Sequence, residues 1–123
     1  MTHLVDLTKK PYNLSEEDVQ WVEKTISQMS LDEKIGQLFV NMGSSRSEEY
    51  LTDMVQNYHI AAVRYNPAKA SEVYDQNYSL QTKSKIPLLI AANTEAGGNG
   101  ACVDGTEVGK EIKIGATNDV RYA

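Results

Sequence analysis

Residues 86–100, Ile-Pro-Leu-Leu-Ile-Ala-Ala-Asn-Thr-Glu-Ala-Gly-Gly-Asn-Gly, decide the fold of this chain. The apolar run at 88–92 behind Pro87 is typical of a strand buried on both faces in a parallel sheet. Proline suits the first position of such a strand and is costly in its middle. Polar residues begin at Asn93, and the small residues at 96–101 let the backbone turn sharply. Because α/β folds bind ligands at the carboxyl ends of parallel strands, we expect a binding site here.

The preceding segments alternate between strand and helix patterns. Apolar runs at 38–42 and 60–65 predict two earlier strands, and helices are expected to begin at Ser47 and to cover 70–83. The inward stripes are predicted to be Leu51, Met54, Val55 and Tyr58 in the first helix and Ala70, Val73, Asn77 and Leu80 in the second. Strand, helix, strand, helix, strand at this spacing indicates right-handed βαβ units, and therefore an α/β fold with parallel strands.

The two ends of the chain are expected to be simpler. Residues 1–13 are predicted to be an extended lead-in, and Ser15 and Ser30 each precede a helical pattern as N-caps. The first of these helices is amphipathic, with Val19, Val22, Ile26 and Met29 on one face. After the glycine-rich loop, residues 111–114 are expected to be a short strand or extended loop, followed by a helix capped by Thr117 or Asn118.

Bulk properties exclude several classes of function. The chain has 123 residues and a net charge of −5, which argues against a nucleic-acid partner. No apolar run approaches the roughly 20 residues needed to cross a bilayer, and no signal peptide is evident, so we expect a cytoplasmic protein without membrane contact. Cys102 is the single cysteine, which excludes an internal disulfide and favours an ordinary small residue. The glycine-rich loop matches neither the Walker phosphate-loop pattern nor the dinucleotide pattern Gly-x-Gly-x-x-Gly.

Three segments carry a resemblance to a known family. Residues 86–100 resemble the third-strand region of glycoside hydrolase family 3, where Ile-Pro introduces a strand that ends in Asp-x-Glu-Gly-Gly-Arg. Residues 29–39 are similar to the family's opening segment, and 114–119 to the segment leading into its third helix. The likeness is greatest to bacterial β-N-acetylhexosaminidases. It implies the N-terminal part of a (β/α)8 TIM barrel, with about three βα units in residues 14–123.

The resemblance also implies sugar-binding positions. Asn93 stands where the family has an acidic residue that hydrogen-bonds sugar hydroxyls, and an amide can both donate and accept such bonds. Asn99 replaces the family's arginine, and Glu95 is a further sugar-facing candidate. Apart from the resemblance, Arg64 is expected to line the same face because it ends the second strand. The structural alternatives are that Asn93 and Glu95 cap the strand and loop, and that Arg64 is a packed ion-pair partner.

The implied activity belongs to a longer protein. Family members of this type remove terminal β-linked N-acetylhexosamine by a retaining mechanism without a cofactor or metal. Their nucleophile and acid/base correspond to positions beyond residue 123, so no catalytic residue is expected here and the isolated chain is predicted to be inactive. The alternatives are a β-glucosidase-type enzyme and a non-catalytic sugar-binding or interaction module. Because the outer strands of three lack neighbours, we expect the isolated chain to self-associate.

Overall fold

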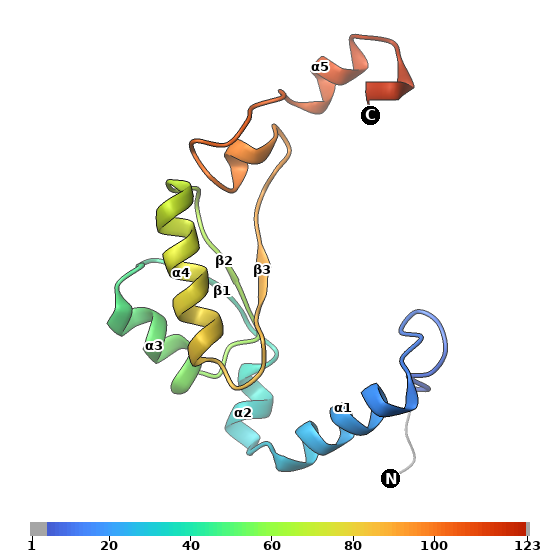
Figure 1. Ribbon diagram of the computed structural model, residues 1–123, viewed down its shortest axis with the longest axis vertical. Helices are drawn as coiled ribbons and strands as arrows, with labels where there is room; N and C mark the ends of the chain where they lie inside the picture. Colours follow the sequence, from blue (N-terminus) through green and yellow to red (C-terminus); the bar gives the residue numbers. More distant parts are fainter. Residues whose placement is uncertain (1–4, 123) are drawn as a thin grey trace.

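The computed structural model describes residues 5–122, which form an open, C-shaped arrangement around one small sheet (Figure 1). The strands are β1 (Val40–Met42), β2 (Ala62–Arg64) and β3 (Leu89–Ala91). They are parallel and lie in the order β1-β2-β3. The predicted α/β class with parallel strands is therefore confirmed, although each strand is shorter than the apolar run that predicted it.

Two helices cover one face of this sheet (Figure 1). They are α3 (Glu48–Gln56) and α4 (Ala70–Lys83), and the predicted bounds of α4 are confirmed. The core lies between these helices and the sheet, and its buried members are Leu51, Val55, Ile60, Val63, Tyr65, Leu80 and Leu88. Val63 and Leu80 are almost completely buried because the central strand packs directly under the helix pair.

The opposite face of the sheet is open, contrary to the prediction that the third strand is buried on both sides. Val40, Ala62 and Leu89 are in register across the three strands, on the face that alternation directs away from Val63. Val40 is 61% exposed and Leu89 is 74% exposed. The reason is that α3 and α4 lie on the same side, and no element in the described part of the chain covers the other side.

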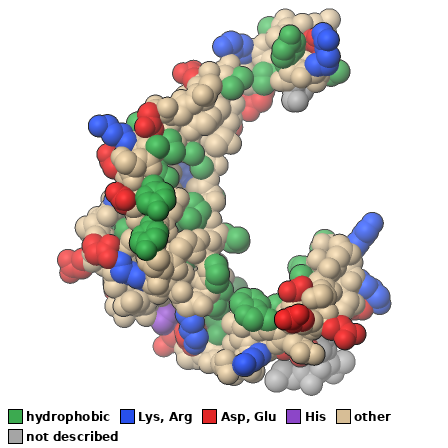
Figure 2. Space-filling view, viewed as in Figure 1, with side chains coloured by type: hydrophobic (Ala, Val, Ile, Leu, Met, Phe, Trp, Pro, Cys, Tyr) green, Lys and Arg blue, Asp and Glu red, His purple; other side chains and the backbone are tan. Residues whose placement is uncertain are grey.

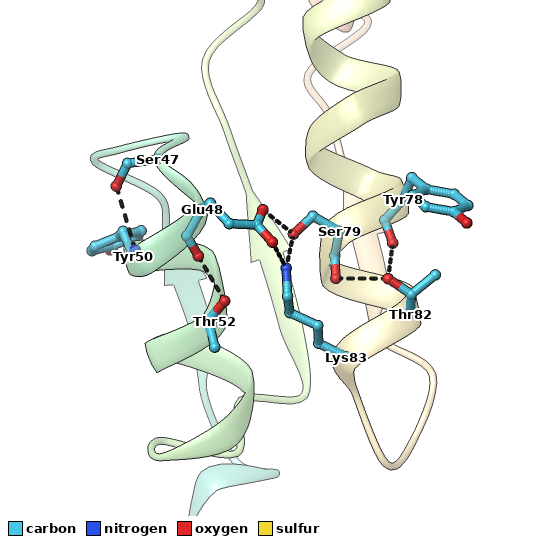
Figure 3. A network of polar contacts seen from close by, with 8 residues as sticks. All are labelled: Ser47, Glu48, Tyr50, Thr52, Tyr78, Ser79, Thr82 and Lys83. Atoms are coloured by element: carbon cyan, nitrogen blue, oxygen red, sulfur yellow. Dashed lines mark hydrogen bonds and ion pairs between the residues drawn. The ribbon is translucent and has the colours of Figure 1, made fainter.

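A polar network joins the two covering helices (Figure 3). Glu48 at the start of α3 forms an ion pair with Lys83 at the end of α4. The hydroxyl of Ser79 donates to the Glu48 carboxylate at 2.9 Å and accepts from the Lys83 amine at 2.6 Å. Lys83 and Ser79 together lower the pKa of Glu48 below its ordinary value. The network therefore holds the first turn of α3 against the last turn of α4.

The end of α4 is also attached to the start of β3. The side-chain amide of Gln81 donates to the carbonyl oxygen of Leu88 at 2.9 Å and accepts from the Leu88 N–H at 3.0 Å. One glutamine thus satisfies both backbone groups of a residue that precedes the strand. The turn between α4 and β3 is fixed in this way.

The N-terminal arm extends away from the sheet (Figure 1). It consists of α1 (Glu16–Gln28) and α2 (Leu31–Gly36), and both predicted N-caps are confirmed as capping boxes, Ser15 with Asp18 and Ser30 with Glu33. No residue of α1 is buried, so its apolar stripe is unpaired or only half covered. Residues 5–13 make successive turns where an extended path was expected, and the expectation for residues 1–4 lies outside the described residues.

Three further predictions are corrected. Residues 111–114 belong to a short helix, α5 (Glu111–Gly115), because Ala116 N–H bonds back to the Ile112 carbonyl; η2 (Val120–Tyr122) follows as a 3-10 turn. Tyr58 is exposed because α3 ends at Gln56, before the left-handed turn at His59. Ala70 is exposed because it is the first residue of α4 and lies outside the packed turns. No helix among residues 5–122 is long and apolar enough to span a membrane.

Candidate functional site

The loop that follows β3 folds back on itself to form a compact unit. The carbonyl oxygen of Ala96 accepts from the N–H groups of Val108 and Gly109 at 2.8 and 2.9 Å. Gly97 has a φ of +124°, and a β-carbon there would lie 2.5 Å from the Thr106 carbonyl oxygen. Only glycine fits this position at low cost. The short 3-10 turn η1 (Gly98–Gly100) follows directly, within the loop where the sequence predicts that the backbone turns sharply.

Gly100 brings the loop against the end of the strand. A β-carbon at Gly100 would lie 1.6 Å from the carbonyl oxygen of Asn93, far inside contact distance. The absence of a side chain therefore allows the returning backbone to pack on Asn93. This close approach fixes the position of the strand end from which Asn93 and Glu95 project.

The loop is anchored to the start of α4. The Asp104 carboxylate accepts from the Ala70 N–H at 2.9 Å, and the Val103 N–H donates to the Ala68 carbonyl at 2.8 Å. Lys69 occupies the N-cap position of α4 and provides no side-chain cap. Asp104 thus satisfies a free helical N–H from a distant part of the sequence. The absence of a capping side chain at Lys69 indicates that the start of α4 needs an acceptor from elsewhere, but it does not identify Asp104 as that acceptor.

A hollow of about 520 Å³ lies beside this loop, at the carboxyl end of β3. Three of the four predicted site residues line it, together with two residues at the start of α5 that the sequence analysis missed; the polar lining is Asn93, Glu95, Asn99, Lys110 and Glu111. The Asn99 Oδ1 atom is buried and accepts no hydrogen bond from any described residue. Lys110 and Glu111 are brought here because the chain turns back after Gly109.

Arg64 does not line this hollow. It ends β2, in register with Met42 and Ala91 on the open face of the sheet, and its guanidinium donates to the Asn66 amide oxygen at 3.1 Å. The half-buried Arg64 side chain therefore lies on the same carboxyl side of the sheet but outside the cluster. The structure brings Asn93, Glu95 and Asn99 together and leaves Arg64 apart.

A second polar cluster lies at the end of β2 and was not predicted. The Arg46 guanidinium lies 4.9 Å from the centre of the Tyr65 ring and donates to Gln76 Oε1 at 2.7 Å. The Tyr65 hydroxyl donates to the Ser45 carbonyl at 2.8 Å, and burial raises the pKa of Tyr65 to about 12. These contacts hold the loop between β1 and α3 against α4, so the cluster has a structural role.

The remaining candidates show no catalytic arrangement. Cys102 is half-buried, and its backbone forms an isolated parallel β-bridge with Ala68. His59 lies in a turn, and its carbonyl oxygen accepts a hydrogen bond from Gln37 Nε2 at 2.7 Å. Among residues 5–122, no group of three or more His, Cys, Asp or Glu side chains is placed to hold a metal ion. What the hollow offers is amides that donate and accept, carboxylates that accept, and one amine. Such mixed groups suit a ligand with several hydroxyls.

Comparisons with known proteins identify relatives of this chain. No family profile matches the sequence. A beta-N-acetylglucosaminidase/beta-glucosidase of Cellulomonas fimi is 32% identical over 119 residues, which is 97% of this chain and 21% of the relative. The beta-glucoside phosphorylase BglX bound to 2FGlc is 41% identical with a TM-score of 0.77, over 92% of this chain and 21% of that one. A second structure of BglX matches equally well. The chain thus spans about a fifth of the length of these relatives.

Proposed function

We propose that this chain corresponds to an N-terminal segment of glycoside hydrolase family 3. On this premise, it forms one wall of the sugar site in an enzyme that cleaves β-glycosides. The names of the relatives support this function, because each includes action on a β-linked sugar. Residues 14–123 would be the first βα units of a longer barrel. The wall would contribute substrate binding, and the reacting carboxylates would come from elsewhere in the enzyme.

The observation that carries the proposal is the hollow at the carboxyl end of β3. It gathers Asn93, Glu95 and Asn99 where parallel-strand folds bind ligands. In this proposal Asn93 donates hydrogen bonds to sugar hydroxyls and accepts hydrogen bonds from them. A further hydroxyl donates to the buried Asn99 Oδ1, which has no hydrogen-bond partner among the described residues. Arg64 would face the substrate from the neighbouring strand end.

The proposed chemistry is retaining glycoside cleavage. A carboxylate nucleophile and an acid/base about 5–5.5 Å apart would form and resolve a covalent glycosyl-enzyme. For the sugar we propose a terminal β-linked N-acetylhexosamine, in line with the first activity in the name of the Cellulomonas fimi relative. A β-glucoside is the second candidate, favoured by the name of BglX, which also makes phosphate a candidate acceptor in place of water.

A chimaera tests these assignments. In it, residues 1–123 replace the matching segment of BglX, and activity is measured on nitrophenyl β-glucoside and nitrophenyl N-acetyl-β-glucosaminide, each with and without phosphate. Asn93→Ala should reduce kcat/KM by the equivalent of about 1–3 kcal/mol with the fold retained. Gln56→Ala, an exposed amide at the end of α3, is the matched control and should change nothing. Unchanged kcat/KM in Asn93→Ala would remove Asn93 from the site.

We further propose that the isolated chain is inactive and self-associates. No residue at 5–122 is assigned a catalytic role, and within this part of the chain β1 and β3 each pair only with β2. Turnover that scales with the purified chain and survives substitution of Glu95 would contradict the first statement. Light scattering that gives the monomer mass at tens of micromolar, together with a cooperative thermal transition, would contradict the second.

A further inference from the structure

The hollow beside β3 is built from two segments that the backbone holds together. The carbonyl oxygen of Ala96 accepts from the N–H groups of Val108 and Gly109 at 2.8 and 2.9 Å. Ala96 directly follows Glu95, and Gly109 directly precedes Lys110. These two hydrogen bonds therefore bring the backbone of Lys110 to the end of β3, and both Lys110 and Glu95 line the hollow.

The charged groups of Lys110 and Glu95 are not used by the chain itself. Neither side chain forms a hydrogen bond or an ion pair with any residue that the structure describes. By contrast, Lys83 and Lys85 each form an ion pair with a glutamate. An ammonium group only donates hydrogen bonds and a carboxylate only accepts them. The amine and the carboxylate of this hollow are therefore both free to bind groups of a ligand.

The balance of charge in the hollow favours a neutral ligand over an anion. Lys110 is the one cation among the described residues that line it, whereas Glu95 and Glu111 supply two carboxylates. Acidic and basic side chains are also interspersed over the end of the molecule that contains α5 (Figure 2). A phosphate or carboxylate group would approach the amine against two like charges. A hydroxyl avoids this repulsion, because it can accept from an amine and donate to a carboxylate.

A buried acceptor in the same hollow points to the same kind of ligand. Asn99 Oδ1 is buried and has no hydrogen-bond partner among the described residues. Such an atom is costly unless a donor reaches it, and a hydroxyl supplies a donor that an ionised phosphate lacks. The volume of about 520 Å³ is in the usual range for small-molecule sites. A sugar ring, with several hydroxyls at fixed spacing, can satisfy the amine, the carboxylate and the amide together.

We propose that Lys110 is a specificity-determining residue of the sugar site. Its amine donates to one ring hydroxyl, and Glu95 accepts from a neighbouring hydroxyl of the same sugar. The inference rests on the proposed function and adds to it the class of sugar that is selected, a neutral ring with a free hydroxyl at the position that Lys110 reaches. A sugar that lacks this hydroxyl, or that carries an anionic group there, is a poorer substrate.

The first test is a pair of lysine substitutions in the chimaera with BglX, measured on the nitrophenyl glycoside that it cleaves faster. Lys110→Met removes the charge and should lower kcat/KM about tenfold or more, as the loss of a hydrogen bond from a charged donor does. Lys113→Met is the matched control, because Lys113 is an exposed residue of α5 outside the lining of the hollow. Circular dichroism checks that both variants fold. Equal kcat/KM in the two variants would overturn the proposal.

Deoxygenated substrates identify the contact. Nitrophenyl glycosides that each lack one ring hydroxyl are compared in the parent chimaera and in Lys110→Met. For one of them the effect of Lys110→Met should disappear, because substrate and variant then remove the same bond. An equal loss with every deoxygenated substrate would show that Lys110 does not contact a hydroxyl. A loss that occurs only when phosphate is present would assign Lys110 to the acceptor, and either result would overturn the proposal.

The Asn93→Ala variant separates this inference from the proposed function. A chimaera that loses activity with Asn93→Ala and keeps it with Lys110→Met would retain the sugar site and overturn only the role of Lys110. A folded chimaera with the unsubstituted segment that cleaves neither nitrophenyl glycoside would overturn the proposed function and this inference with it.

Discussion

The two faces of one three-stranded sheet differ in what covers them. On the helix-covered face, Val63 is 1% exposed and belongs to the core, while on the other face Leu89 is 74% exposed. Both residues belong to apolar strand segments with similar sequence character. The difference shows that an apolar strand pattern predicts which side chains can be buried, and does not predict whether they are. Burial follows only where another element covers them.

The same contrast extends to the polar contacts. The covered side has the Glu48–Ser79–Lys83 network and the Gln81 bonds to Leu88, which join helices to each other and to the sheet. The side chains facing away carry no comparable set of hydrogen bonds among the described residues. We therefore expect the stability of the chain to come almost entirely from the covered half, and each substitution below tests that expectation.

The largest effect is expected from removing core volume on the covered side. Leu80 is fully buried in α4, so Leu80→Ala should lower the free energy of unfolding by about 2–5 kcal/mol. Leu89→Ala removes the same atoms from an exposed side chain and should change it by at most about 0.5 kcal/mol. Urea titrations of both variants measure the difference. Equal losses would show that the open face is buried in solution.

A smaller effect is expected where the loop approaches the strand end. Gly100→Ala forces a β-carbon against the Asn93 carbonyl and should cost about 1–3 kcal/mol through displacement of the loop. Gly115→Ala is the matched control, since nothing lies within 4 Å of its β-carbon. In the chimaera, Gly100→Ala should also reduce kcat/KM, because Asn93 moves. If both alanine variants match the parent, the loop does not pack on Asn93 as described.

The attachment of the loop to the covering helix is the next test. Asp104→Ala removes the acceptor of the Ala70 N–H and should lower the free energy of unfolding by about 0.5–2 kcal/mol, as loss of a helix cap does. Asp75→Ala, at an exposed position of α4, serves as the control. Hydrogen exchange of the first turn of α4 should accelerate in the Asp104 variant alone. Acceleration in both variants would point to a general loss of helix charge.

The smallest effect is a dependence on pH within the covering layer. Lys83 and Ser79 hold the pKa of Glu48 below its ordinary value of 4.5. Since the folded-state pKa is the lower one, the stabilisation is complete above the ordinary value and is lost as pH falls through the folded-state value. Glu48→Gln should therefore be less stable than the parent at neutral pH, and the gap should close in acid. A gap that is constant with pH would exclude the ion pair as its source.

Local signals in the sequence predicted much of this arrangement. Three helices are preceded by a serine whose side chain accepts from the backbone N–H three residues later, namely Ser15, Ser30 and Ser47. Such a cap can be predicted from four consecutive residues. The alternation of strands and helices predicted a parallel sheet because parallel neighbouring strands need a long crossover between them, which is usually a helix. These features depend on neighbours in sequence, so no knowledge of distant contacts was needed.

The predictions that were wrong or incomplete concern features that depend on residues distant in the sequence. Exposure of Leu89 is decided by whether anything covers the open face, and the lining of the hollow by Lys110 is decided by the path of the chain after Gly109. The segment at 111–114 has Ile112 and Ile114 in alternation, which fits a strand and a single helical turn equally well. Asn93, Glu95 and Asn99 line one hollow because they lie close together in sequence, whereas Arg64 comes from a different strand and lies apart.

The bond from Asp104 to the start of α4 has a consequence for the order of events during synthesis. Its acceptor lies 34 positions after Ala70. At about 5–20 residues per second, that acceptor leaves the ribosome about 2–7 seconds after the helix start it serves. We expect the first turn of α4 to be less stable during this interval and to gain its cap once Asp104 emerges. Nascent chains arrested before and after Asp104 should therefore differ sharply in hydrogen-exchange protection at the first turn of α4.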